Sequence, residues 1–235
     1  MISIVTGTLN RRHVLEGLIG NTVDAWDKLE LVLVDGGSTD GTVEYLKSLN
    51  HPRIKLIEVG KRSSYWHYMN LGVRNAMYEY VCQWNDDVLM VNKWEEVFDA
   101  VKNCDASLFS WQYGDMTDRF PDNWNLCCYF DGPGLVPGVG HEIVMNYGVY
   151  KKDVFRKAGL YNNAYSYYYA DGDMSFRAWA FGFSVKPFPD IHVVSLITER
   201  ENKKAINTQD GLQIYTTFLS QYRKKEMPSN IEFLQ

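Results

Sequence analysis

The sequence predicts an α/β protein with a mixed, mostly parallel central sheet flanked by helices. In the first half of the chain, short apolar segments rich in Ile and Val alternate with segments whose apolar residues recur at helical spacing. Short turns connect these segments, which is typical of a parallel sheet covered on both faces. Polar residues and glycines follow the apolar segments. The length of 235 residues fits one large domain.

The expected elements of the first half are four strands and four helices in alternation. The strands are expected over residues 2–6, 29–34, 54–59 and 81–84, and the helices over residues 13–26, 41–49, 66–80 and 92–102. The second half is less regular. Strands are expected there over residues 107–113, 143–150, 183–186 and 192–195, with helices starting at residue 152 and over 171–181 and 209–224. Residues 115–140, which contain several prolines and glycines, are expected to form a long loop.

The composition excludes several classes of protein. Hydrophobic residues make up 46% of the chain and charged residues 23%, which is typical of a globular protein. The net charge of −5 argues against a nucleic-acid partner bound by bulk electrostatics. No apolar run is long enough to cross a bilayer, and no signal peptide is expected. The four cysteines form no Cys-x-x-Cys pair, so reduced thiols and a cytoplasmic location are expected.

The first candidate site follows the second predicted strand. Ligands of parallel α/β sheets bind beyond the carboxyl ends of the strands. Asp35 lies at such an end, and the glycines Gly36 and Gly37 allow a ligand to approach the backbone closely. Asp35 is therefore a candidate acceptor for a nucleobase N–H or a ribose hydroxyl. The alternative is an ordinary glycine-rich turn in which Thr39 or Asp40 caps the next helix.

The second candidate site is Asn85-Asp86-Asp87, after the fourth predicted strand. Adjacent carboxylates repel each other, and a hard divalent cation such as Mg²⁺ or Mn²⁺ relieves that repulsion. The alternative is a surface turn that caps a helix. The sequence also lacks the glycine patterns of phosphate-loop NTPases and of nicotinamide-dependent enzymes.

The third candidate site is the pair Asp171 and Asp173 at a predicted helix start. Residues two apart face different sides of a helix, so one acid is expected to face a cleft as a general base while the other caps the helix or holds Arg177. The alternative is that both acids only complement the helix dipole. His192, in an apolar strand, is a candidate metal ligand or phosphate contact, against the alternative of a structural histidine.

Taken in order, these motifs resemble the family-2 glycosyltransferases, which have the GT-A (nucleotide-diphospho-sugar transferase) fold. The resemblance extends over residues 2–195. Residues 3–11 are similar to the family's first strand and nucleotide-binding turn, and residues 31–42 to the donor-base segment, with Gly36 in place of a second acid. Residues 70–76 resemble the family's Arg-Asn helix near the donor.

The acidic motifs also resemble those of the family, with substitutions. Asn85-Asp86-Asp87 is similar to the Asp-x-Asp metal motif, with Asn85 in place of the first acid. Residues 170–173 are similar to a Glu-Asp-x-Asp segment, with Ala170 in place of Glu. His192 falls near a metal-binding histidine found in many GT-A enzymes.

The resemblance implies an inverting transfer of a sugar from a nucleotide-diphosphate donor, UDP- or dTDP-linked, to a hydroxyl of a glycan or other acceptor. It implies Asp171 as catalytic base and Mn²⁺ or Mg²⁺ held by Asp87 and His192. The implied donor-binding residues are Thr6, Thr8, Asn10, Arg11, Asp35, Arg74, Asn85 and Asp86. Lys61 and Arg62 are further candidates for phosphate contact.

The resemblance also divides the chain into a donor-binding half (residues 1–105), an acceptor-binding half (106–200) and a C-terminal segment (201–235), with a lid expected over 199–204. Aromatic residues of the second half could form an acceptor platform or pack in the core: Trp111, Tyr113, Trp124, Tyr129, Phe130, Tyr165, Tyr167, Tyr168 and Tyr169. A nucleotidyltransferase is disfavoured, because residues 6–12 hold only one glycine. A catalytically inactive nucleotide-sugar or glycan-binding module stays open, because Gly36, Asn85 and Ala170 depart from the family pattern.

Overall fold

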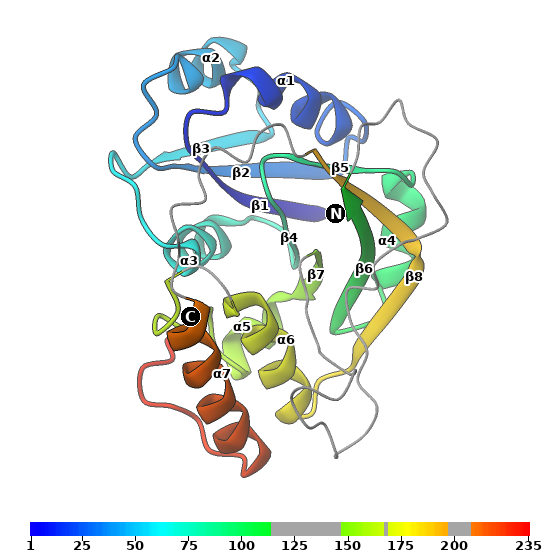
Figure 1. The fold of residues 1–235 in the computed structure, drawn as a ribbon. Helices are drawn as coiled ribbons and strands as arrows, with labels where there is room; N and C mark the ends of the chain where they lie inside the picture. Colours follow the sequence, from blue (N-terminus) through cyan, green and yellow to red (C-terminus); the bar gives the residue numbers. More distant parts are fainter. Residues whose placement is uncertain (114–146, 167–168, 197–207) are drawn as a thin grey trace.

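The computed structural model describes residues 1–113, 147–166, 169–196 and 208–235 (Figure 1). Three sequence predictions lie outside the described residues: the loop over 115–140, the lid over 199–204 and most of the aromatic platform. Of that platform, Tyr165 and Tyr169 are described with their side chains.

The described strands form one eight-stranded sheet in the order β3-β2-β1-β4-β7-β6-β8-β5. The strands are β1 (Ile2–Thr8), β2 (Leu29–Asp35), β3 (Ile54–Glu58), β4 (Tyr80–Gln83), β5 (Val88–Met90), β6 (Ala106–Tyr113), β7 (Gly148–Lys151) and β8 (Val185–Ser195). Strands β3, β2, β1 and β4 are parallel, as are β6 and β8, whereas β7 and β5 run antiparallel to their neighbours. The predicted mixed, mostly parallel sheet is therefore confirmed.

The helices cover the sheet from both sides (Figure 1). They are α1 (Arg12–Asn21), α2 (Thr42–Leu49), α3 (Tyr65–Asn75), α4 (Trp94–Val101), α5 (Lys152–Lys157), α6 (Ala170–Ala180) and α7 (Thr208–Arg223). Helices α1 and α2 lie on one side of β1, β2 and β3, and α3 lies on the other side. None of the described helices is long and apolar enough to cross a membrane.

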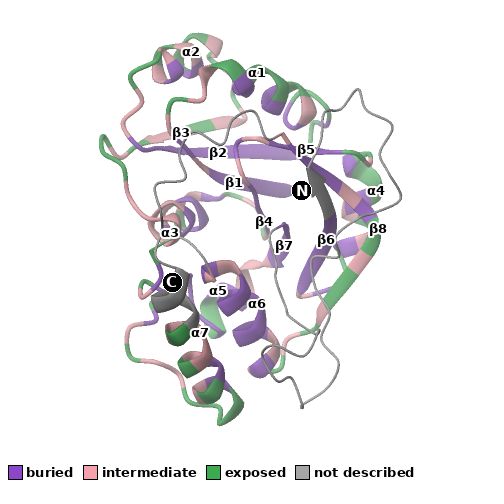
Figure 2. Ribbon diagram, viewed as in Figure 1, coloured by how far each residue is buried: buried purple, intermediate pink, exposed green. Residues whose placement is uncertain are grey.

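The core is centred on β1 and β2 (Figure 2). Every residue of β2 is buried, as expected for a parallel strand covered on both faces. Gly72 lets α3 approach β1 closely, because a Cβ at this position would overlap the side chain of Val5. This close packing places the first turn of α3 at the carboxyl end of β1.

Several element boundaries differ from the sequence prediction. Helix α1 ends at Asn21 rather than at residue 26. Directly after this end, the Thr22 hydroxyl donates to the Leu18 carbonyl at 2.6 Å. Helix α3 ends at Asn75 because Ala76 is extended. The two short strands predicted over residues 183–186 and 192–195 are one strand, β8. Its pairing with β6 shifts register between Phe109 and Ser110. The three-residue strand β5 was not predicted, because it exists only through its pairing with β8.

The C-terminal tail returns to the body of the protein after α7. The Leu160 amide donates to the Glu232 carbonyl at 2.7 Å, and the Leu234 amide donates to the Phe155 carbonyl at 3.1 Å. Ile231 is buried beside Gly159. The tail thus fixes the end of α7 against the segment that follows α5.

Candidate active site

A cavity of about 340 Å³ opens at the carboxyl ends of β1 and β4. This is the sheet edge at which the sequence predicted a ligand site. The residues that line the cavity are Gly7, Thr8, Leu9, Arg11, Arg62, Ser63, Tyr65, Tyr68, Asn85, Asp86 and Asp87. Five of the predicted site residues are among them, namely Thr8, Arg11, Asn85, Asp86 and Asp87.

Strand β1 and the turn after it supply one wall of the cavity. The Arg11 guanidinium Nε lies 3.9 Å from Asp86 Oδ1. Thr6 is buried, its hydroxyl donates to the Gly7 carbonyl at 3.0 Å, and it is not one of the described residues that line the cavity. Asn10 has a left-handed backbone and connects two loops, since its Oδ1 accepts from the Thr39 amide at 2.8 Å.

The turn after β4 supplies the acidic wall. Burial and the neighbouring carboxylate of Asp87 raise the pKa of Asp86 to about 7, although Arg11 and the Thr8 hydroxyl act in the opposite direction. Burial also raises the pKa of Asp87. The Asn85 side-chain amide donates to the Tyr147 hydroxyl at 3.3 Å. The wall therefore holds two carboxylates that a cation would stabilise.

The acidic wall fits a hard divalent cation. Its carboxylate and amide oxygens are the ligands that Mg²⁺ and Mn²⁺ prefer, and one or two protein carboxylates plus phosphate oxygens are a common ligand set. Within the described part of the chain, no group of three or more His, Cys, Asp or Glu residues could hold a metal ion. Phosphate oxygens and water could complete the ligand set of a cation bound at Asp87.

The structure does not bring His192 to Asp87. The Asp87 carbonyl accepts from the Leu196 amide at 2.7 Å, whereas the His192 carbonyl accepts from the Val91 amide at 2.9 Å. The two residues are thus separated by four positions along β8, or roughly 13 Å. Burial lowers the pKa of His192, and its backbone amide donates to Asn92 Oδ1 at 2.7 Å. In this structure the two predicted metal ligands do not share a site.

Asp35 shapes the turn after β2. Its Oδ1 accepts from the amides of Gly37 and Ser38 at 2.9 and 3.0 Å, and its Oδ2 accepts from the Ser38 hydroxyl. Asp35 is buried and is not one of the described residues that line the cavity. A Cβ on Gly36 would overlap the Tyr68 hydroxyl, so glycine at this position makes room for the Tyr68 ring.

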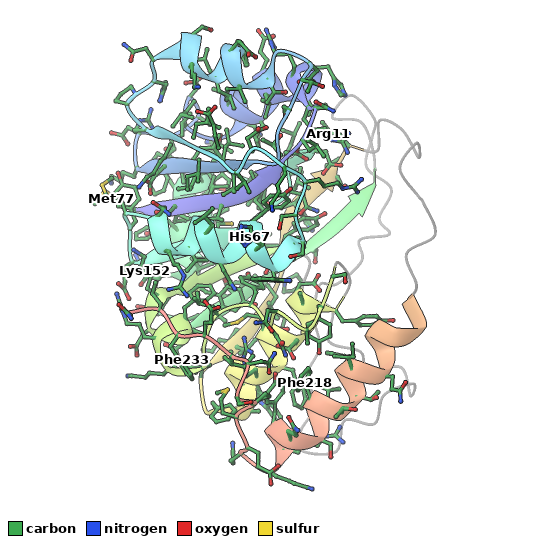
Figure 3. The ribbon with its side chains drawn as sticks, turned by 90° about the vertical axis from the view of Figure 1, so that its left-hand side faces the viewer. Arg11, His67, Met77, Lys152, Phe218 and Phe233 are labelled. Atoms are coloured by element: carbon green, nitrogen blue, oxygen red, sulfur yellow. The ribbon has the colours of Figure 1, made fainter. Side chains whose placement is uncertain are left out.

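Arg74 lies at the last turn of α3, far from the cavity end of that helix. Its guanidinium contacts Glu232 of the C-terminal tail at 2.6 Å. Met77, shortly after α3, lies on the opposite side of the molecule from Arg11 in Figure 3. Arg74 is not one of the described residues that line the cavity.

The two acids of α6 have different environments. Asp173 is fully buried and pairs with Arg177 at 3.3 Å, which agrees with the prediction that one acid holds Arg177. Asp171 is only half-buried, and its Oδ1 accepts from the Gly172 amide at 2.9 Å. Burial raises the pKa of Asp171 to about 6, and Asp173 adds to this effect. Its side chain lies close enough to Tyr65, a cavity residue, to contribute to the raised pKa of that hydroxyl.

The sequence analysis missed two aromatic residues of the cavity. Tyr65 and Tyr68 lie one turn apart at the start of α3 and both line the cavity. The Tyr68 hydroxyl accepts from the Ser63 amide at 2.6 Å. Their spacing of three residues, at the start of the helix that follows the third strand, was the signal that could have identified them. Arg62, considered as a phosphate contact, also lines the cavity.

The family comparison agrees with this geometry. The profile described as Glycosyl transferase family 2 matches residues 3–159, so the chain belongs to that family. The matched region includes every described residue that lines the cavity. A search of curated proteins finds no match to the sequence.

Solved structures share the fold at low sequence identity. One is a mannosyltransferase from Pyrobaculum calidifontis in complex with GDP-Man and Mn²⁺, with a TM-score of 0.62, 19% identity and alignment over 85% of this chain. Another is residues 1–349 of S. aureus TarS in complex with UDP-GlcNAc, with a TM-score of 0.67, 15% identity and alignment over 92% of this chain. The predicted GT-A fold is therefore confirmed.

This chain spans only part of the proteins it resembles. The alignments cover 57% of the mannosyltransferase and 65% of the TarS chain with UDP-GlcNAc.

Proposed function

We propose that the protein is an inverting glycosyltransferase that moves a sugar from a UDP- or dTDP-linked donor to a hydroxyl of a glycan or other acceptor. One observation carries the proposal. The cavity at the carboxyl ends of β1 and β4 has Asp86 and Asp87 on one wall and Arg11 and Arg62 among its lining residues. Family membership and the fold shared with proteins solved in complex with GDP-Man and UDP-GlcNAc support it.

The cavity residues can divide the donor between them. The aromatic rings of Tyr65 and Tyr68 offer apolar surface for a base or a sugar face. Arg11 and Arg62 offer cationic groups to the diphosphate. Asp87 would hold Mn²⁺ or Mg²⁺, and a bound metal ion neutralises charge on a leaving diphosphate. Thr8, Asn85 and Asp86 complete the wall, while Thr6, Asn10 and Asp35 shape the loops behind it.

Asp171 is proposed as the general base. It accepts the proton of the acceptor hydroxyl as that oxygen forms a bond to the anomeric carbon. The bond from that carbon to the diphosphate breaks, and its electron pair leaves with the diphosphate. The raised pKa of Asp171, about 6, suits this role because the carboxylate is ionised at neutral pH yet basic enough to take a proton.

Nucleotide binding tests the donor site. Calorimetric titrations with UDP, dTDP, GDP and CDP, each with and without Mn²⁺, are compared for the wild type, Asp87→Ala and Asp105→Ala. Asp105 pairs with Lys151, which lies beside Tyr80 at the end of β4 away from the cavity. The Asp105 variant is therefore the control. We expect one nucleotide to bind tightly, with dependence on both Mn²⁺ and Asp87. Absence of binding by all four nucleotides would contradict the proposal.

Turnover tests the enzymatic role. Release of nucleoside diphosphate from the donor is measured for the wild type and Asp171→Asn. Loss of a general base is expected to slow turnover about 10²- to 10⁴-fold while nucleotide affinity stays unchanged. Nucleotide binding without turnover in either protein would favour the alternative, a nucleotide-sugar-binding module on the same fold.

A further inference from the structure

Helix α7 presents one continuous aromatic stripe to α6. Tyr215, Phe218, Leu219 and Tyr222 recur at the spacing of one helix face. Leu219 and Tyr222 are buried, and the Phe218 ring lies 6.1 Å from Tyr165 and 6.2 Å from Tyr222, centroid to centroid. Figure 3 labels Phe218 on this helix. The stripe lies outside the region that the family profile matches.

The stripe contacts Tyr169, the residue directly before α6. The Tyr215 ring stacks on the Tyr169 ring, with centroids 5.3 Å apart and an interplanar angle of 27°. Tyr169 has a φ of +72°, a left-handed conformation that is unfavourable for a residue with a side chain. Its carbonyl accepts from the Asp173 amide at 2.8 Å and so closes the first turn of the helix. The unfavourable conformation persists where surrounding contacts hold it, and Tyr215 supplies such a contact.

The stripe contacts the same turn a second time, on the other side of Asp171. The Tyr222 hydroxyl donates to Asp173 Oδ1 at 2.8 Å, and the Tyr165 hydroxyl donates to the same atom at 3.1 Å. Asp173 also pairs with Arg177, whose guanidinium donates to the Leu160 carbonyl. The residues on both sides of Asp171, at positions 169 and 173, are therefore both in contact with α7.

Helix α7 is itself anchored independently of this turn. At its end, the Lys225 ammonium donates to the Ala180 carbonyl at the far end of α6. The tail beyond it is held by the Glu232 carbonyl, which accepts from the Leu160 amide, and by the ion pair of Glu232 with Arg74. A helix fixed at its C-terminal end can act as a rigid support for the turn that carries Asp171.

We propose that α7 positions Asp171 by fixing the first turn of α6, with Tyr215 and Tyr222 as positioning residues. This inference rests on the proposed role of Asp171 as general base. The aromatic stack holds the backbone on one side of Asp171, and the Tyr222 hydroxyl holds Asp173 on the other. Removing either contact lets the turn relax and moves the carboxylate away from the acceptor hydroxyl, while the donor cavity stays intact.

The test compares Tyr215→Leu with Tyr215→Phe, which keeps the ring, and with Tyr222→Phe, which keeps the ring and removes only the hydroxyl. Tyr80→Leu is the matched control, because Tyr80 is also a half-buried ring with an aromatic neighbour, Phe98 at 5.5 Å, at the opposite end of β4. For each variant, kcat, the donor KM and the hydrogen-exchange rate of the Asp173 amide are measured.

We expect Tyr215→Leu to lower kcat about 10- to 100-fold with an unchanged donor KM, because a small misplacement of a catalytic group has effects of this size. The Asp173 amide is expected to exchange about tenfold faster in Tyr215→Leu. Tyr215→Phe is expected to restore both values, and Tyr222→Phe to reproduce part of the loss. Tyr80→Leu is expected to leave both values at the wild-type level.

Two outcomes overturn the inference. One is an unchanged exchange rate of the Asp173 amide in Tyr215→Leu, which shows that α7 does not hold the turn. The other is a rise in donor KM that accounts for the whole loss of kcat/KM, which shows that the defect lies in the donor cavity. A wild-type protein without any turnover contradicts the proposed function instead, and the exchange rates then decide by themselves whether α7 holds the turn.

Discussion

Two aspartate–arginine pairs among the described residues lie in contrasting environments. Arg11 and Asp86 lie 3.9 Å apart at the wall of the cavity, with side chains 31% and 12% exposed. Arg177 and Asp173 lie 3.3 Å apart with no exposed surface on either side chain. Asp173 also accepts from two tyrosine hydroxyls, whereas Asp86 has a second carboxylate, Asp87, beside it.

This difference separates an acid that stabilises the fold from an acid that is available to a ligand. The Asp173 carboxylate is compensated within the protein by the Arg177 charge and by two tyrosine hydroxyls, and losing it leaves the buried Arg177 charge uncompensated. A carboxylate that lies beside a second carboxylate in a cavity is stabilised further by a divalent metal ion. Asp171, half-buried and near Tyr65, is only two residues from Asp173, and the proposed function assigns it to the acids that are available to a ligand.

The largest effect is expected from Asp173→Asn. Breaking a buried ion pair leaves Arg177 with an uncompensated charge, so the free energy of unfolding should fall by about 3–5 kcal/mol. Denaturant titration measures this change. Asp99→Asn, which breaks the exposed pair of Asp99 with Lys102, is the control and should change stability little. Equal stabilities of the two variants would refute the contrast between the buried and the exposed acids.

Asp171→Asn should have the opposite sign. The folded-state pKa of Asp171, about 6, lies above its usual value of 3.8, so the folded protein favours the protonated carboxyl. Above pH 6 the wild type therefore carries a cost of ionisation that asparagine avoids, about 3 kcal/mol for a shift of about two units. Denaturant titrations at several pH values should show the variant more stable at pH 7.5 and the difference vanishing near pH 4. A variant that is less stable at pH 7.5 would contradict this prediction.

The pattern of local sequence predicted most of the sheet and its edge. The alternation of apolar segments with helical ones located β1, β2, β3 and β4. Strand β2 is a largely apolar segment, as expected for a parallel strand buried on both faces, whereas the edge strand β3 is only partly buried. Because the carboxyl ends of parallel strands lie at one edge of the sheet, the same pattern placed Thr8, Arg11 and the acids after β4 at that edge, where the cavity opens. These features depend on local sequence and on a general rule of sheet topology.

The remaining features depend on tertiary contacts that local sequence does not encode. The position of His192 relative to Asp87 follows from the register of β8 against β5, and β5 itself is only three residues long. The partners of Asp35 and Arg74 also depend on the folded structure. Asp35 accepts from the Ser38 amide of its own turn, whereas Arg74 contacts Glu232, 158 residues further along the chain. The tyrosines of α7 gain their significance only once that helix lies on α6.

A smaller effect is expected from Arg11→Gln. Arg11 lowers the pKa of Asp86, so its removal should raise that pKa further above 7 and leave more of the carboxyl protonated. Nucleotide affinity in the presence of Mn²⁺ should then fall about tenfold at pH 6.5 and by less at pH 8.5, where the carboxyl ionises again. Arg11→Lys keeps the charge and is the control in the same calorimetric titration. A loss that does not depend on pH would mean that the direct contact of Arg11 with the diphosphate outweighs its effect on the ionisation of Asp86.

The smallest effect is expected from Arg74→Ala, which tests a residue that the sequence predicted at the donor. Its contact with Glu232 is exposed, and exposed pairs contribute about 0–1 kcal/mol to stability. The structure places Arg74 at the end of α3 remote from Tyr65 and Tyr68, so nucleotide affinity should stay within about twofold of the wild type. Calorimetry under the conditions used for Arg11→Gln makes the two arginines directly comparable. A loss for Arg74→Ala as large as that for Arg11→Gln would mean that α3 rearranges when the donor binds, because Arg74 lies in the last turn of α3 and is not one of the described residues that line the cavity.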